Sequence, residues 1–147
     1  NSKFVAGFIG SPQMNFMEVV VERDAESPSG FACVLDNKRH FAILPREGMQ
    51  DFAAYEGKKV IMGIRPEHIY TGRTIPGETD MADLPAMIDL VEPVGSEVYL
   101  FVEVAGFKLC AKLPPITGLE EGEQVNLKID LKKMYIFDAE TEKALYN

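Results

Sequence analysis

Residues 86–113 read AMIDLVEPVGSEVYLFVEVAGFKLCAKL, and this stretch decides the fold. Apolar and polar side chains alternate over 86–92, 97–105 and 107–113, and Gly95 and Gly106 separate these segments. Alternation with period two puts the apolar side chains on one face of a strand, and a glycine between two such segments favours a tight turn. The stretch therefore predicts three consecutive strands.

Two more alternating segments follow, over 124–131 and 134–137, after the breaks that Pro114-Pro115 and Gly122 introduce. Five short strands with few helical segments are typical of a small Greek-key barrel. The chain is therefore predicted to be mainly all-β, with this barrel in its second half.

The first half predicts additional strands and one short helix. Alternation begins at Asn15, and segments 31–35 and 41–44 are joined by a turn-forming Asp-Asn-Lys, which predicts a hairpin; 59–65 predicts a further strand. Apolar spacing over 3–9, after Ser2 and before Gly10, predicts a short helix. The Gly-, Pro-, Thr- and Asp-rich residues 70–85 predict a surface loop.

Composition limits the functions that this chain can have. Its 147 residues are 46% hydrophobic and 26% charged, which is typical of one globular domain or two small ones in close contact. The formal net charge is −8, and residues 74–107 contain seven acidic residues and no basic one. Nucleic-acid binding needs positive charge near the phosphates, so it is disfavoured.

Known catalytic motifs are missing from the sequence. The nearest approach to a phosphate-binding loop, at Gly57-Lys58-Lys59, has Phe52 where the first glycine belongs and no hydroxyl residue after the lysine. There is no G-x-S-x-G and no H-E-x-x-H. Cys33 and Cys110 lie in separate alternating segments and are predicted to be buried thiols. We therefore expect neither catalysis nor a metal site in this chain.

The densest polar cluster is Arg65-Pro66-Glu67-His68, directly after an apolar strand. A carboxylate beside an imidazole is one arrangement for proton transfer. The favoured interpretation is instead a structural or inter-subunit cluster of Arg65, Glu67 and His68, in which the arginine and the glutamate make ion pairs that hold two loops or two subunits together.

Four stretches resemble one known family. Residues 4–12 (FVAGFIGSP) with 14–16 (MNF) resemble the junction segment of ATPase subunits of bacterial sugar importers of the maltose and glycerol-3-phosphate type. The stretch GIRPEH at 63–68 resembles that family's G-x-R-P-E-H. Residues 91–99 (VEPVGSEVY) resemble its V-E-x-x-G-x-E, and Phe137-Asp138 with Thr141 resembles its closing strand and tail.

The resemblance implies a regulatory domain of the TOBE type, an oligonucleotide-binding-like barrel, in the ATP-binding subunit of a carbohydrate importer. It implies no cofactor in this chain, because ATP and Mg would bind in an upstream nucleotide-binding domain that the chain lacks. The implied partners are a second copy of the subunit, that upstream domain, the transporter's membrane subunits and a regulatory protein, but no nucleic acid. The implied location is cytoplasmic, at the inner face of the cell membrane.

On this interpretation the chain is one regulatory domain, and its apolar opening forms the junction with the upstream domain. The predicted junction residues are Phe4, Phe8, Pro12, Met14 and Asn15. The predicted parts are 1–13, junction helix and turn; 14–69, first strand set; 70–85, loop; 86–138, barrel strands; and 139–147, tail. The alternatives are a free-standing barrel that binds a small ligand such as an oxyanion, a single-strand nucleic-acid module, and a small enzyme that uses Glu67 and His68.

Overall fold

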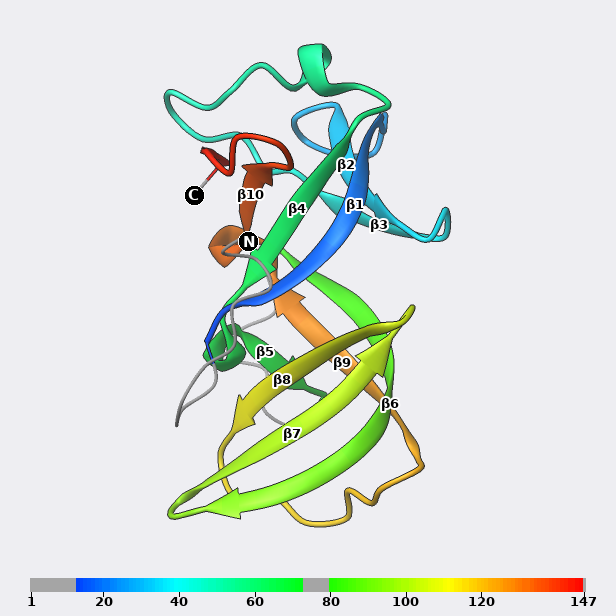
Figure 1. The fold of residues 1–147 in the computed structure, drawn as a ribbon, viewed down its shortest axis with the longest axis vertical. Helices are drawn as coiled ribbons and strands as arrows, with labels where there is room; N and C mark the ends of the chain where they lie inside the picture. The colour runs from blue at the N-terminus through cyan, green and yellow to red at the C-terminus, as the bar shows by residue number, and fades with distance from the viewer. Residues whose placement is uncertain (1–12, 73–79, 147) are drawn as a thin grey trace.

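The computed structural model describes residues 13–72 and 80–146, and strands dominate it (Figure 1). Helical structure in these residues is limited to short 3₁₀ turns, η2 (Phe52–Tyr55), η3 (Pro66–His68) and η4 (Leu131–Lys133). The prediction of a mainly all-β chain is confirmed. The helix predicted over 3–9 lies outside the described residues.

The first sheet has six antiparallel strands in the order β11-β10-β4-β1-β2-β3. It occupies the upper part of Figure 1. Its central strand β1 pairs with β4 on one side and β2 on the other, with Met17 opposite Met62 and Val21 opposite Cys33. The strands are β1 (Asn15–Arg23), β2 (Phe31–Leu35), β3 (Arg39–Ala42), β4 (Lys59–Ile64), β10 (Tyr135–Asp138) and β11 (Ala144–Tyr146).

The second sheet has five antiparallel strands in the order β5-β9-β6-β7-β8 and curls into a half-barrel, in the lower part of Figure 1. The long strand β6 pairs with β9 along its first half and with β7 along its second half. The strands are β5 (Ile69–Thr71), β6 (Met81–Val94), β7 (Glu97–Val104), β8 (Phe107–Leu113) and β9 (Gln124–Asp130).

Both sheets contain the same Greek-key order, in which a fourth strand returns beside the first of three consecutive strands. The order is β4-β1-β2-β3 in the first sheet and β9-β6-β7-β8 in the second. A further strand then crosses over from each half. After β4 the chain passes through η3 into β5, which pairs with β9, and after β9 it passes through η4 into β10, which pairs with β4. The two sheets thus exchange a strand.

The predicted hairpin over 31–44 is confirmed as β2 and β3. Asp36 and Asn37 have φ values of 53° and 56° between these strands. Two consecutive residues with positive φ match the twist of a two-residue hairpin turn, and Asn and Asp tolerate that conformation. Ala105 and Gly106 form the corresponding turn between β7 and β8 and also have positive φ values, of 51° and 86°.

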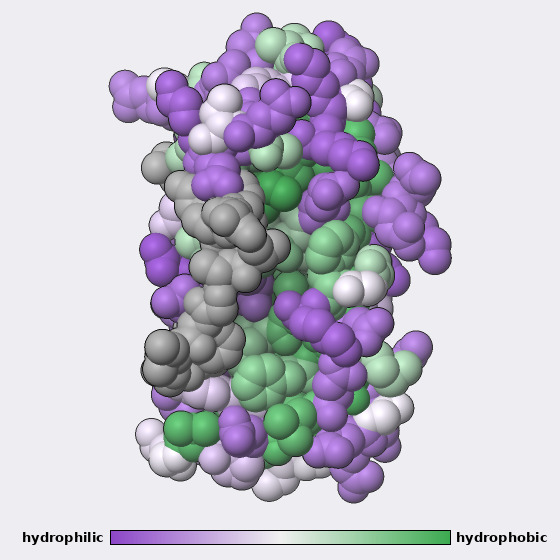
Figure 2. All heavy atoms as spheres, in the orientation of Figure 1, coloured by the Kyte–Doolittle hydropathy of each residue, from purple (hydrophilic) through white to green (hydrophobic). Residues whose placement is uncertain are grey.

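One apolar core runs through both sheets. Each strand contributes side chains at alternate positions, such as Met17 and Val19 in β1 and Leu127 and Ile129 in β9. Charged residues occupy the outward positions, and Figure 2 shows hydrophilic side chains over much of the visible face. Both cysteines are free and buried, as predicted, and burial raises the pKa of the Cys33 thiol to about 12.

The predicted loop over 70–85 is wrong at both ends. Tyr70 and Thr71 belong to β5, and β6 begins at Met81 and includes Pro85. Within residues 13–72 and 80–146, the first half of β6 pairs with β9 alone, so no second neighbouring strand there requires an N–H from Pro85.

The predicted grouping of the strands is also wrong in two places. The segment 134–137, assigned to the barrel, contributes β10 to the first sheet, where Ile136 lies opposite Met62. The predicted tail 139–147 contains β11, which extends that sheet. Alternation identifies a strand from its own residues, but the neighbour of that strand depends on distant ones.

Candidate functional site at the junction of the two sheets

Asn15 joins the two sheets. It is the first residue of β1, is 7% exposed, and lies beside the open edge of β8. Its carboxamide oxygen accepts a hydrogen bond from the Cys110 N–H at 2.8 Å, and its Nδ2 donates to the Cys110 carbonyl at 2.9 Å and to the Ile64 carbonyl at 3.1 Å. The side chain therefore acts like the peptide of an adjoining strand and satisfies backbone groups of both sheets.

The predicted polar cluster lies where the chain leaves the first sheet. Ile64 and Ile69 are fully buried on either side of η3, and Pro66 starts this turn with a φ suited to it. The His68 N–H donates to the Arg65 carbonyl at 3.0 Å and closes the turn. Because both flanking strands are anchored in the core, the turn presents its side chains in a fixed arrangement.

The structure bears on the ion pairs predicted between loops at this turn, whereas ion pairs between subunits stay a prediction. Within residues 13–72 and 80–146, neither Arg65 nor Glu67 forms an ion pair, and both are exposed. The Arg65 guanidinium lies 5.6 Å from the centre of the Tyr135 ring, a cation–π contact with the crossover strand β10. The proposed internal ion pairs are thus absent from the described part of the chain.

His68 has an unusual environment. The residue is partly exposed, yet its Nδ1 is buried and has no hydrogen-bond partner in the described structure. A buried polar atom without a partner costs free energy. Within the described residues His68 also forms no ion pair with Glu67.

A groove of about 640 Å³ runs beside η3. Glu67 and Tyr70 form one side, and Lys112 and Pro114-Pro115 form another. Burial raises the pKa of the Tyr70 hydroxyl, and the carboxylates of Asp130 and Glu67 raise it further, so this hydroxyl stays protonated at neutral pH. The groove thus joins a fixed carboxylate to an apolar wall.

An aromatic strip covers the adjoining face of the first sheet. Phe16 and Phe137 meet edge to face with ring centres 6.0 Å apart, and Tyr135 stacks on Phe137 at 6.1 Å. Gly63 lies beneath: a Cβ there would stand 2.6 Å from Met14 Sδ and 3.2 Å from the Phe137 ring. Met14 therefore packs against the strip through the space that this glycine leaves.

Of the predicted junction residues, Phe4, Phe8 and Pro12 lie outside the described residues. Met14 contacts the aromatic strip, and Asn15 is bonded within the chain. Sequence reasoning missed Gly63, Tyr135 and Phe137 as members of this region. The spacing of Tyr135 and Phe137, two residues apart on one strand, was a signal that both would share a face.

In 13–72 and 80–146, no cluster of three or more His, Cys, Asp or Glu side chains could hold a metal ion. No helix in that part of the chain combines the length and the apolar character that crossing a bilayer requires.

Two Greek-key sheets that exchange a strand, with a polar turn between them, define a small all-β module. Two family models match the chain: the MalK OB fold domain over residues 10–69 and the TOBE domain over residues 62–137. The chain belongs to the TOBE domain family. The two matches overlap at residues 62–69, at the end of β4 and through η3.

Curated relatives carry both domains within longer proteins. The chain is 35% identical over 147 residues to the osmoprotective compounds uptake ATP-binding protein GgtA of Synechocystis and to the trehalose/maltose import ATP-binding protein MalK of Thermococcus litoralis. It is 34% identical to the multiple sugar-binding transport ATP-binding protein MsmK of Streptococcus mutans. Each match covers 97–98% of this chain and 37% of the relative. The chain spans little more than a third of these proteins.

One solved structure shows the same arrangement of strands at low sequence identity. The cytoplasmic molybdate-binding protein ModG matches with a TM-score of 0.59 over 87% of this chain and 96% of its own, at 11% identity. This likeness concerns the fold alone.

Proposed function

We propose that the chain is the regulatory and dimerisation domain of the ATP-binding subunit of an ABC importer for carbohydrates, with two copies in the assembled transporter. The observation that carries this proposal is the match along nearly the whole chain to two ATP-binding proteins named for trehalose/maltose import and multiple sugar transport. The chain itself performs no catalysis in this proposal. ATP and Mg bind in a nucleotide-binding domain outside it, on the cytoplasmic side of the membrane and next to the membrane subunits.

The geometry supports a mechanical role. Because each sheet contains a strand from the other half, and Asn15 bonds to both, the two sheets resist movement against one another. A rigid pair of such domains is the fixed contact about which ATP-driven closure of the upstream domains takes place. A regulatory protein that preferred the open state by ~3 kcal/mol would shift the closing equilibrium by roughly a hundredfold.

The polar turn is the proposed contact with the second copy. Arg65 and Glu67 are exposed on this turn and neither is in an ion pair in the described residues, so both can pair with a partner without breaking an ion pair in that part of the chain. His68 is partly exposed beside them on the same turn. The junction with the upstream domain uses Phe4, Phe8, Pro12, Met14 and Asn15, the last two beside the aromatic strip and the sheet junction.

The test is a charge reversal in the full-length subunit. In the Glu67→Lys variant, we expect weaker subunit pairing in sedimentation velocity, or misregulated transport in reconstituted vesicles, with unchanged ATP hydrolysis per paired subunit. Glu121→Lys is the matched control, because Glu121 is an exposed carboxylate in the loop before β9. Loss of ATP hydrolysis by fully paired Glu67→Lys subunits would contradict the proposal.

A further inference from the structure

The large apolar side chains that are exposed in residues 13–72 and 80–146 all lie on β6. They are Met87, Leu90 and Val94, whose exposed fractions are 40%, 42% and 40%. Single exposed apolar residues are common on protein surfaces, whereas a contiguous group of them marks a place of contact with another molecule. We call Met87, Leu90 and Val94 the β6 stripe.

A bulge puts the whole β6 stripe on one face of the second sheet. Strict alternation would turn Leu90 to the opposite face from Met87. However, the register of β6 against β7 shifts at Asp89, which has no opposite residue on β7. The three residues of the stripe therefore lie opposite residues of β7 that are spaced by even numbers, namely Glu103, Phe101 and Glu97. The intervening residues of β7 are buried in the core, so the stripe is on the outer face.

The neighbouring strands extend this apolar surface. Phe101 on β7 lies opposite Leu90 and is partly exposed, and Cys110 on β8 lies opposite Phe101. Figure 2 shows hydrophobic side chains in the lower part of the visible face, where β6, β7 and β8 lie in Figure 1. The stripe thus belongs to a surface that crosses three strands.

Carboxylates outnumber lysines around this surface. Glu92 lies between Leu90 and Val94, is exposed, and forms no ion pair in the described residues. Glu123 is likewise exposed and in no ion pair there, and its carbonyl accepts a hydrogen bond from the Ile88 N–H at 2.8 Å, which places it beside β6. The lysines on the outer face of the sheet are already paired: Lys108 with Asp89 and Glu103, Lys112 with Glu97, and Lys128 with Asp83. The surface beside the stripe is therefore negatively charged.

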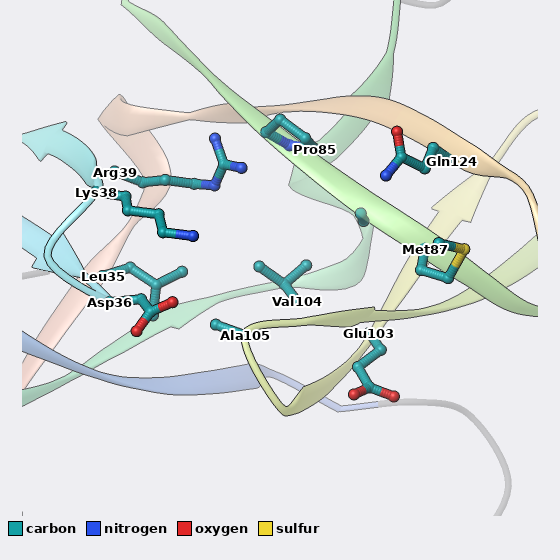
Figure 3. A pocket seen from close by; sticks show the side chains of 11 residues that line it. Leu35, Asp36, Lys38, Arg39, Pro85, Met87, Glu103, Val104, Ala105 and Gln124 are labelled. Carbon is teal, nitrogen blue, oxygen red and sulfur yellow. The ribbon is translucent and has the colours of Figure 1, made fainter.

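The Met87 end of the stripe adds no net charge. Met87 borders a pocket of about 270 Å³ that is lined by Lys38 and Arg39 and also by Asp36 and Glu103 (Figure 3). These two cations and two carboxylates balance one another. The charge preference of the stripe is thus set at its other end, around Leu90 and Val94.

The charge and the strand edge restrict what can bind here. Two copies of this surface would bring carboxylates against carboxylates, which disfavours self-association, and an anionic lipid surface is disfavoured in the same way. Beyond Ile88, β7 is the only strand in the described residues that pairs with β6. Pro93 has no N–H to donate at the open edge, and the bulge at Asp89 interrupts the register; both features protect an edge from pairing with a further strand. A partner therefore lies across the outer face and does not extend the sheet.

We propose that the β6 stripe is the docking site for a basic amphipathic α-helix of another protein. From Met87 to Val94 the strand covers about 23 Å, which is the length of an α-helix of about 15 residues. Apolar side chains one turn apart on the helix pack on the stripe and on Phe101, and Lys or Arg side chains at the margins of its apolar face pair with Glu92 and Glu123. The proposal does not rest on the importer assignment, because exposure, register and charge carry it.

The experiment is a fluorescence anisotropy titration of the 147-residue chain into a labelled peptide of about 15 residues, in which Leu and Lys occupy opposite faces of a helix. A second peptide has the same composition in an order that gives no apolar face. We expect saturable binding of the first peptide and at least about tenfold weaker binding of the second.

Variants of the chain test the two parts of the surface. Leu90→Thr/Val94→Thr keeps residues that favour strands but removes exposed apolar surface, and it should weaken binding at least about tenfold. Its control is Val20→Thr, at a partly exposed position of β1, which should bind as the unaltered chain does. Glu92→Gln should weaken binding by about two- to fivefold, whereas Glu140→Gln, which removes an exposed carboxylate before β11, should not.

The proposal is overturned if the chain shows no saturable binding of the first peptide up to millimolar concentrations. Equal affinity for the two peptides would overturn it as well, because it would show a response to charge alone, and so would equal losses in Leu90→Thr/Val94→Thr and Val20→Thr. Co-sedimentation of the chain with phosphatidylglycerol vesicles, lost in Leu90→Thr/Val94→Thr, would assign the stripe to a membrane surface instead. Circular dichroism checks that each variant is folded.

Discussion

Replacing Asn15 should measurably destabilise the whole chain. Asn15→Ala removes three hydrogen bonds of 2.8 to 3.1 Å and leaves the N–H of Cys110, a residue only 5% exposed, without its acceptor. An unsatisfied buried group costs about 1–3 kcal/mol, and the two carbonyls lose their donor as well, so we expect a total of about 3 kcal/mol. For a chain of this size that corresponds to a fall in Tm of about 6 to 12 °C.

The charged replacement makes the test sharper. In Asn15→Asp the carboxylate can still accept from the Cys110 N–H, but it cannot donate to the carbonyls of Cys110 and Ile64. The folded state therefore raises the pKa of the new carboxyl above its unfolded value of about 3.9, because the protonated form can donate to one carbonyl. At pH 7 Asn15→Asp should be at least as unstable as Asn15→Ala. Its stability relative to the unaltered chain should rise as the pH falls towards 4.

The assay is urea unfolding followed by far-ultraviolet circular dichroism between pH 4 and pH 7, since the chain has no tryptophan. Asn126→Ala is the control, because Asn126 is an exposed asparagine whose one side-chain hydrogen bond, to Asp83, is long at 3.4 Å. It should change stability by no more than about 0.5 kcal/mol. A cost below about 1 kcal/mol for Asn15→Ala, or a pH-independent cost for Asn15→Asp, would refute the assigned hydrogen-bond pattern.

Three further predictions concern the first sheet. Gly63→Ala should destabilise the chain by about 1 kcal/mol, and Met14→Ala in the same chain should remove most of that cost, as a double-mutant cycle by thermal unfolding would show. Asp138 accepts hydrogen bonds from the Tyr55 hydroxyl and the N–H groups of Glu140 and Thr141, which lower its pKa to about 2. The Asp138 carboxylate should therefore stabilise the fold fully above about pH 4, and this stabilisation should disappear as the pH falls through 2. In acid titrations, the difference in unfolding free energy between the unaltered chain and Asp138→Asn should shrink over that range. Tyr146 is 2% exposed, lies 3.8 Å from the Arg46 guanidinium and donates to the Leu44 carbonyl at 2.7 Å. Tyr146→Ala should cost about 3–5 kcal/mol and Tyr146→Phe about 1 kcal/mol in urea unfolding, and equal costs would show that the hydroxyl matters more than the ring.

Local patterns identified most of the strands but not how they pair. The alternation over 97–105 and 107–113 predicts β7 and β8 because the period depends on adjacent residues only. Nothing local to Tyr135 or Ile136 indicates that they pair with β4, more than seventy residues earlier. Glycine, proline, threonine and aspartate over 70–85 predict a loop, although β6 begins at Met81. Within the described residues only β9 pairs with this part of β6, so the strand accepts Pro85.

The sequence indicated where the Arg65–His68 turn lies in the chain but not which residues its side chains contact. The Arg65–His68 turn was correctly placed after an apolar strand, and the structure fixes it between two buried isoleucines. Within the described residues Arg65 forms no ion pair; its guanidinium instead contacts the ring of Tyr135. Tyr135 lies on β10, the strand that crosses over from the second half of the chain to pair with β4. Asn15 was selected as a junction residue, and its bonds to β8 could not be foreseen without the position of that strand.

The exchanged strands also affect how this chain can be made and divided. During synthesis the first sheet cannot be completed until β10 and β11, the last strands of this chain, have been made. Likewise β5 cannot pair until β9 has been made. Pairing between such distant segments is entropically costly until both are present, which favours a single late and cooperative folding step. A cut between β5 and β6 would give two fragments, each holding a strand that belongs to the other. Such fragments should fold only when mixed. Folding of the pair would therefore report that the two fragments have met.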